Sequence, residues 1–140
     1  MSAPRSLALV ANGVLLTAIG VDVVLPALSY AQPTWWFDVL HVGVSPDAMD
    51  LALLHRAAAQ WIAFALLQII ALVDWRRWPD WLLLVAGART SDWLTDLTYF
   101  AVAPDLSSWR WALLAPPLLN FGMSLILFGV WRRVRASAEQ

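Results

Sequence analysis

Four long runs of apolar residues divide the chain, and short polar segments separate them. The runs cover about residues 7–30, 47–73, 81–103 and 111–131. Each is near or above the ~20 residues that an α-helix, rising ~1.5 Å per residue, needs to cross ~30 Å of hydrocarbon. A membrane-spanning strand would be about half as long and part of a many-stranded barrel. The pattern therefore predicts an all-α integral membrane protein, a four-helix antiparallel bundle that forms a single transmembrane domain over residues 1–140.

The longest connection lies between the first two predicted spans and has a helical pattern of its own. Residues 34–41 are amphipathic enough to form a short helix lying in the membrane interface. Ser45 followed by Pro46 is typical of an N-cap and a first helical position, so the second helix is expected to begin before it enters the bilayer. Pro116 and Pro117 are expected to kink or unwind the fourth helix near its start.

The positions of the arginines predict the direction of the spans. One arginine precedes the first span, two lie between the second and third, and three follow the fourth. By the positive-inside rule, both termini and the loop at residues 74–80 are therefore cytoplasmic. The arginines in question are Arg5, Arg76, Arg77, Arg132, Arg133 and Arg135.

Composition agrees with the membrane class. Hydrophobic residues make up 61% of the chain and charged residues 14%, against about 25% charged residues in soluble domains. The formal net charge of −1 does not favour a nucleic-acid partner. There is no cysteine, which excludes disulfides and thiol catalysis. Every basic residue is an arginine, and the abundance of Ala, Leu and Trp indicates a GC-rich bacterium and thus a bacterial inner membrane.

Most of the ten tryptophans fall at the predicted ends of spans, where amphipathic indole rings are enriched. Only Trp61 and Trp93 lie well inside a span. The tryptophans at the ends are interpreted as an aromatic belt, with a pigment or cofactor box as the alternative. They are Trp35, Trp36, Trp75, Trp78, Trp81, Trp109, Trp111 and Trp131.

Ionisable residues inside spans are costly to bury, and by default they are paired or functional. Arg89, Asp92 and Asp96 share one face of the third span, because they are spaced i, i+3, i+7. Arg56 and Gln60 share a face of the second. We expect these two faces to meet in the outer half of the membrane, with the carboxylate of the first span as a third wall. The polar residues within the spans are Asn12, Asp22, His55, Arg56, Gln60, Gln68, Arg89, Asp92, Asp96 and Asn120.

Two interpretations of this cluster stay open. Its formal charges nearly cancel, as a paired network in a low dielectric requires, so it could be an inter-helical lock. It could also be a pocket for the head of an amphiphile, in which Arg56 and Arg89 hold a phosphate, carboxylate or quinone oxygen. Asp92 and Asp96, one turn apart, are then candidates for a catalytic acid and base. The other candidate ligand-binding residues are Asp22, His55, Gln60, Asn120 and Trp93.

The first span also has a second interpretation. Arg5, the apolar run and Ser29-Tyr30-Ala31 resemble a signal peptide with a small-residue cleavage site. The run is long for a signal and contains Asn12 and Asp22, so we expect a retained helix. Cleavage would leave three spans and remove Asp22 from the cluster.

A metal site is not expected. His41 and His55 could each ligate a metal or a pigment magnesium, but neither has a second histidine three or four residues away. No glutamate lies within a span, and no phosphate-binding loop or nucleophile elbow occurs. The sequence requires no cofactor; a lipid or a quinone is the ligand class that a pocket would suit.

Three features resemble the DoxX-like group of small four-helix bacterial membrane proteins. They are the segment His55-Arg56-Ala57-Ala58-Ala59, Arg89 followed by Asp92, and the short outer segment before the second span. The fourth span, with Pro116, Pro117 and Asn120, does not match. The resemblance implies a four-helix architecture and an accessory role in a membrane redox system.

Three functions are therefore considered. The first is a non-catalytic accessory subunit that binds membrane partners or a lipophilic cofactor such as quinone. The second is an isomerase, hydratase or cyclase acting on an isoprenoid or lipid, and the third is a small proton-linked transporter. The expected partners are the lipid bilayer and either a larger membrane complex or further copies of the chain, without nucleic acid.

Overall fold

The computed structural model describes residues 4–40, 45–102 and 114–138, and these are helical apart from short connections. No strand occurs in the described ranges, so the all-α prediction is confirmed. His41, the last residue of the third predicted span and the start of the fourth lie outside the described residues. The helices are α1 (Arg5–Ala31), α2 (Pro33–Leu40), α3 (Ala48–Asp74), α4 (Asp80–Val102) and α5 (Ala115–Ala138).

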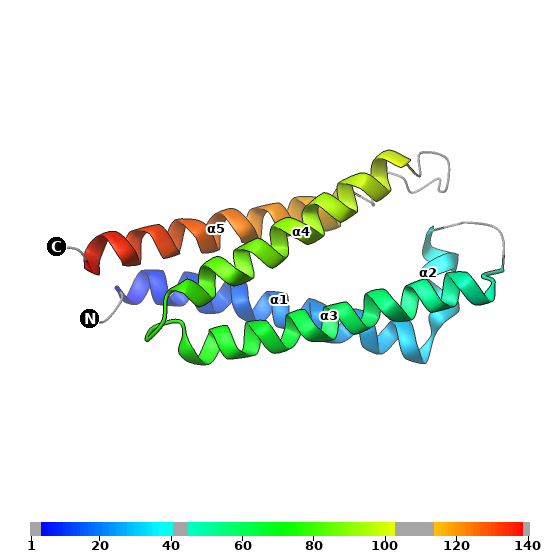
Figure 1. The fold of residues 1–140 in the computed structure, drawn as a ribbon, viewed down its shortest axis with the longest axis horizontal. Coiled ribbons are helices and arrows are strands. Elements are labelled where there is room, and N and C mark those ends of the chain that lie inside the picture. Colours follow the sequence, from blue (N-terminus) through cyan, green and yellow to red (C-terminus); the bar gives the residue numbers. More distant parts are fainter. Residues whose placement is uncertain (1–3, 41–44, 103–113, 139–140) are drawn as a thin grey trace.

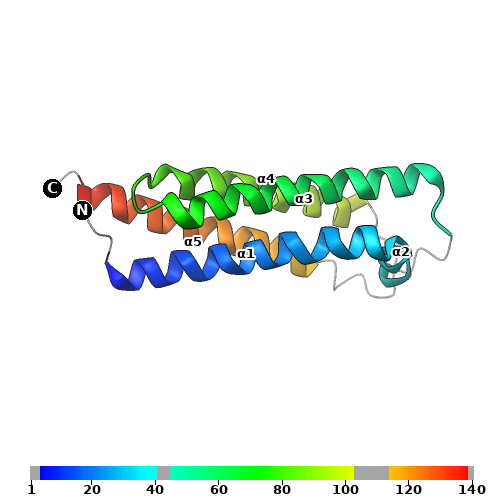
Figure 2. The ribbon, with the colours of Figure 1, turned by 90° about the horizontal axis from the view of Figure 1, so that it is seen from below.

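Four long helices run along the long axis of the molecule, each opposite in direction to the long helix before it (Figure 1). The start of α1, the end of α5 and the turn between α3 and α4 lie at one end, called the terminal end below (Figure 1, Figure 2). The short helix α2 lies at the opposite, far end. The most extensive packing joins α1 to α3 and α4 to α5, so the molecule consists of two helix pairs.

The apolar character of the helices differs. Among the described residues, α1 and α3 are long and apolar enough to cross a membrane by length and composition. In α4 the apolar sequence is interrupted by Arg89, Asp92 and Asp96. Large apolar side chains are nonetheless exposed on all four long helices, and examples are Leu9, Leu16, Ile62, Leu66, Leu84, Leu94, Leu118 and Leu125.

The start of α3 is fixed by a capping box. The Asp47 carboxylate accepts hydrogen bonds from the backbone N–H groups of Met49, at 2.7 Å, and Asp50, at 2.8 Å. The Asp50 carboxylate accepts one in return from the Asp47 N–H, at 3.0 Å. The prediction of Ser45 as the N-cap is therefore wrong. A carboxylate two residues later reaches two free amides of the first turn, which makes it the better cap.

The two prolines of α5 also differ from the prediction. The helix begins at Ala115, so Pro116 and Pro117 occupy its first turn and do not kink it. The first amides of a helix have no intrahelical acceptor, and proline is tolerated there because it lacks an N–H.

The terminal end has a tightly packed apolar core. Trp75, Leu82 and Leu127 are fully buried there, and Leu15 joins them from α1. The Trp75 Nε1–H donates to Asn12 Oδ1 at 2.9 Å, so this indole is held inside the protein. Trp75 was expected in the interfacial belt. It does lie at the end of a predicted span, but its ring contacts the core and not the exterior.

Candidate functional site

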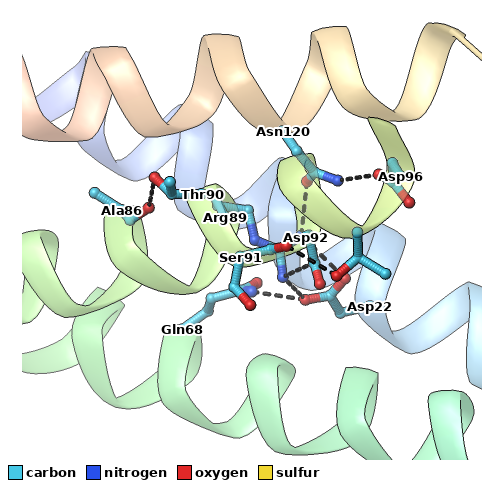
Figure 3. Close-up of polar contacts among 10 residues, drawn as sticks. Asp22, Gln68, Ala86, Arg89, Thr90, Ser91, Asp92, Asp96 and Asn120 are labelled. Atoms are coloured by element: carbon cyan, nitrogen blue, oxygen red, sulfur yellow. Dashed lines mark hydrogen bonds and ion pairs between the residues drawn. The ribbon is translucent and has the colours of Figure 1, made fainter. Parts of the chain in front are cut away.

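A network of buried polar side chains joins all four long helices around Arg89 (Figure 3). Both guanidinium nitrogens Nη1 and Nη2 donate to the Asp22 carboxylate, Nη1 at 3.2 Å. Gln68 Nε2 donates to the same carboxylate at 2.7 Å, and Asn120 Oδ1 accepts from Arg89 Nη1 at 3.2 Å. Asp22 lies on α1, Gln68 on α3, Arg89 on α4 and Asn120 on α5. The network therefore ties the two helix pairs together.

Two carboxylates of α4 extend this network towards the far end. Asp92 Oδ2 lies 3.4 Å from Arg89 Nη2, and Asp96 Oδ2 accepts a hydrogen bond from Asn120 Nδ2 at 2.9 Å. The Arg89 guanidinium also lies 5.4 Å from the ring centroid of Phe64, which suits a cation–π contact. The predicted i, i+3, i+7 face of α4 thus brings its three members into one cluster, with Asp22 opposite.

The prediction that Arg56 and Gln60 face this cluster is wrong, because both are exposed. The buried face of α3 includes Ala58, Ala65 and Gln68. Positions 56 and 60 each lie two residues from Ala58, and two residues turn a helix by about 200°. These side chains therefore point away from the α4 carboxylates, and Gln68 supplies the polar contact from α3.

Among the described residues, the ring contacts of His55 and Trp93 are with aromatic residues of other helices and not with the Arg89 network. The His55 ring stacks on Tyr30, with centroids 4.8 Å apart, and the Tyr30 hydroxyl donates to the His55 carbonyl at 3.3 Å. His55 Nε2 is buried and has no hydrogen-bond partner among the described residues. Trp93 packs against Phe121 at 4.8 Å between ring centroids, which joins α4 to α5. Both residues contribute helix–helix contacts.

A second polar contact joins α4 to α5 nearer the terminal end. The hydroxyls of Thr90 and Ser124 lie 2.8 Å apart, and both donate to the Ala86 carbonyl, at 2.9 and 3.0 Å (Figure 3 shows the Thr90 bond). These contacts fix the register of α4 against α5. The Arg89 network then joins the α4–α5 pair to α1 and α3.

A cavity of about 590 Å³ opens beside the network. The side chains of the cluster form its polar end, and aromatic and aliphatic side chains form its walls. Trp36 and Trp61 face each other at 5.8 Å between ring centroids, and Trp36 is held by a 2.7 Å hydrogen bond from its Nε1–H to Ser29 Oγ. The described lining residues are Val21, Asp22, Leu25, Trp36, Trp61, Arg89, Asp92, Asp96, Ala115, Pro116, Leu119 and Asn120.

The sequence interpretation missed the two tryptophans as wall residues. Trp36 was assigned to the interfacial belt, and Trp61 was noted only as one of two tryptophans inside a span. The position of Trp61 two turns before the buried Gln68 was the available signal, since residues seven apart share a helix face. Nothing in the sequence indicated that α2 folds back to bring Trp36 beside it.

The site can bind by hydrogen bonding and charge, with an apolar wall alongside. Within the described ranges, no group of three or more His, Cys, Asp or Glu side chains has the arrangement to hold a metal ion. Comparisons with protein-family models, with curated proteins and with solved structures find no match. The resemblance to the DoxX-like group therefore stays a prediction, and the site has to be interpreted from its own chemistry.

Proposed function

We propose that this chain is a non-catalytic integral membrane protein that binds a lipophilic small molecule within its helix bundle. In this proposal α1, α3, α4 and α5 cross a bacterial inner membrane as an antiparallel bundle, with both termini in the cytoplasm. Exposed apolar side chains on all four helices support contact with lipid. The ionisable residues of α4 support it too, because inside a membrane such residues face the bundle interior and pair there.

The cavity is the observation that carries the binding function. Its volume of about 590 Å³ falls within the range of about 300–1,000 Å³ typical of small-molecule sites. One end is polar, and Trp36, Trp61 and Leu119 form apolar walls. This division matches an amphiphile whose head group reaches the carboxylates of α4 and whose apolar part contacts the walls.

The contacts of Arg89 support a non-catalytic role for the protein. Asp22, Asn120 and Asp92 contact its two terminal nitrogens, so the guanidinium chiefly holds the helix pairs together. The ion pair beside the cavity therefore supports a structural role for Arg89 and a binding role for the cavity. A quinone or a lipid is the ligand suggested by the sequence, and the protein would present it within a larger membrane complex or in a homo-oligomer.

An enzyme acting on an amphiphile is the second candidate. It is favoured by the two carboxylates that line the cavity with different partners, Asp92 beside Arg89 and Asp96 beside Asn120. Different surroundings are how two carboxyl groups take separate acid and base roles. The purified protein would then convert the bound amphiphile, and Asp92→Asn would abolish the conversion. This result would establish the enzyme in place of the non-catalytic binding function.

A proton-linked transporter has less support. The described residues of the terminal end that pack together are apolar, with Leu15, Leu82, Val85 and Leu127 at their centre. A polar path from the cluster to that end would have to pass through them. This apolar core between the α4 carboxylates and the terminal end counts against a continuous proton path.

The proposal is tested by gentle native extraction followed by mass spectrometry of co-purifying lipids and proteins. We expect one amphiphile at about one molecule per chain. Ala115→Phe, which places a ring into the cavity, should remove it. Ala59→Phe is the matched control, because Ala59 is exposed on α3 and is not a lining residue of the cavity.

Equal retention of the amphiphile by the wild type and Ala115→Phe would contradict the proposal. So would the absence of any enriched amphiphile from a preparation that contains stoichiometric protein partners. The control variant has to match the wild type in thermal stability and in bound amphiphile, so that an effect of Ala115→Phe is assigned to the cavity.

A further inference from the structure

The charges around the cavity are unequal. Its described lining residues include three carboxylates, Asp22, Asp92 and Asp96, and a single guanidinium, that of Arg89. Asp22 is the carboxylate most fully matched, since it accepts hydrogen bonds from both Arg89 and Gln68. Asp92 and Asp96 therefore give this end of the cavity an excess of negative charge.

Most N–H groups of Arg89 already have partners within the protein. Its Nη1 donates to Asp22 and Asn120, and its Nη2 contacts Asp22 and Asp92. Only Nε is buried without a partner among the described residues, which leaves one N–H for a ligand. Arg56, the second anchor expected from the sequence, is exposed and does not line the cavity. A phosphate or carboxylate head group would thus meet two carboxylates and only one free N–H of Arg89.

The two carboxylates of α4 instead retain capacity to accept. Asp92 contacts Arg89 through Oδ2 at 3.4 Å, and Asp96 accepts from Asn120 through Oδ2 at 2.9 Å. The Oδ1 atoms of both make no hydrogen bond with a described residue. Carboxylate oxygens next to a cavity favour a hydrogen-bond donor, and above all a positive charge, because burying unmatched carboxylates is costly.

The tryptophans of the wall suit the same head group. Trp36 and Trp61 form an aromatic pair on the cavity, and the hydrogen bond from Trp36 to Ser29 holds it in place. Cations are attracted to the faces of tryptophan rings, and aromatic cages bind quaternary ammonium groups. The remaining wall, with Leu25 and Leu119, is apolar and can accommodate hydrocarbon.

We infer that the cavity takes a lipophilic organic cation, such as an amphiphile with an alkylammonium head. Asp92 and Asp96 supply the opposite charge, Trp36 and Trp61 contact the cation through their rings, and the aliphatic wall accepts its apolar groups. This inference rests on the proposed binding function and names the ligand class for that site.

The test compares two ions of the same shape and opposite charge, tetraphenylphosphonium and tetraphenylborate, in binding to the purified full-length protein in lipid nanodiscs. We expect saturable binding of the cation, with the anion at least about tenfold weaker, since each ~1.4 kcal/mol corresponds to a factor of ten. The double variant Asp92→Asn with Asp96→Asn should bind the cation about tenfold or more weakly. It should also show a smaller difference in affinity between the two ions.

Asp38→Asn is the matched control, because Asp38 is an exposed carboxylate on α2 and is not among the described lining residues. It should leave the affinity for the cation unchanged. Equal losses in Asp38→Asn and the double variant would overturn the inference, because the cation would then respond to surface charge alone. If the double variant fails to fold, the single variants Asp92→Asn and Asp96→Asn, checked by thermal unfolding, make the same comparison.

Failure of the inference and failure of the proposed function give different results. Two results would overturn the inference of a cationic ligand and leave the binding function intact. One is stronger binding of tetraphenylborate than of tetraphenylphosphonium, and the other is saturable binding of only a neutral quinone such as decylubiquinone. If neither ion nor the quinone binds, and no amphiphile co-purifies, both are wrong.

Discussion

The two ends of the helix bundle are built on different principles. At the terminal end, Trp75, Leu82 and Leu127 are fully buried in an apolar core between the helices. Towards the far end, a polar network around Arg89 joins the same helices, and a cavity of about 590 Å³ lies beside it. The comparison indicates a division of labour, in which apolar packing joins the helices at one end and a polar network beside the cavity joins them towards the other.

The division has an energetic reason. In the proposed membrane location, helices gain little from hydrophobic association, so their contact would depend on close packing and on interhelical hydrogen bonds. The helices are joined at the terminal end by apolar packing and by a part-buried hydrogen bond from Trp75 to Asn12. The network contains a buried ion pair, which stabilises the fold only while both charged partners are present. Variants that remove one partner should therefore affect the two ends differently.

The largest effect is expected from Arg89→Met, which breaks the network. It leaves Asp22 buried without its cation, and removing one partner of a buried ion pair typically costs about 3–5 kcal/mol. We expect loss of the folded state or a large fall in thermal stability in detergent. Adding Asp22→Leu should restore much of the stability, because the orphaned charge is then gone. A double variant no more stable than Arg89→Met would contradict the pairing.

The next largest effect is expected from Leu127→Ala in the terminal core. Leu127 is fully buried, and truncating such a side chain costs about 2–5 kcal/mol. Leu119→Ala, which lines the cavity and is 44% exposed, should cost far less. Thermal unfolding measures the stability, and binding of tetraphenylphosphonium measures the site. Leu127→Ala should lower stability with little change in affinity, and the opposite ranking would refute the division of labour.

The smallest effect concerns Asp80, which precedes the third predicted span at the terminal end. Hydrogen bonds from the Trp131 indole, at 2.9 Å, and from Arg135 hold the pKa of this carboxyl below its usual value. A lowered pKa means that the contact stabilises the folded state above about pH 4, the ordinary pKa of an aspartate, and loses this contribution as the pH falls through the folded-state value.

Because Asp80 is exposed, solvent screens the interaction and the effect should be small. Thermal unfolding between pH 3 and pH 7 should show a slightly weaker dependence on pH in Asp80→Asn than in the wild type. An unchanged pH profile would mean that the Trp131 and Arg135 contacts contribute nothing to stability.

The sequence predicted those parts of the site that depend on a single helix. Arg89, Asp92 and Asp96 share a face because their spacing alone decides it, and the structure brings them together. The expected contact with Arg56 depended on how α3 is rotated against α4. That rotation follows from packing of small residues such as Ala58 and Ala65, which a local pattern of polar positions does not report.

The cavity could not be predicted for a related reason. Its walls come from five helices, and Trp36 reaches it only because α2 folds back over the far end. The start of α3 shows a smaller failure of the same kind. Ser45-Pro46 and Asp47 are both plausible starts in sequence, and the reciprocal hydrogen bonds between Asp47 and Asp50 decide between them.

The ion pair between Asp22 and Arg89 has a consequence for synthesis. Its partners are 67 residues apart in the chain, and Gln68 is 46 residues from Asp22. At about 5–20 residues per second, a ribosome delivers Arg89 roughly 3–13 s after Asp22. In the proposed topology, the first helix therefore waits in or beside the translocation channel with an uncompensated carboxylate. In that topology the Asp22 carboxylate meets its cation only when the third long helix arrives, so we expect membrane insertion of the chain to be cooperative.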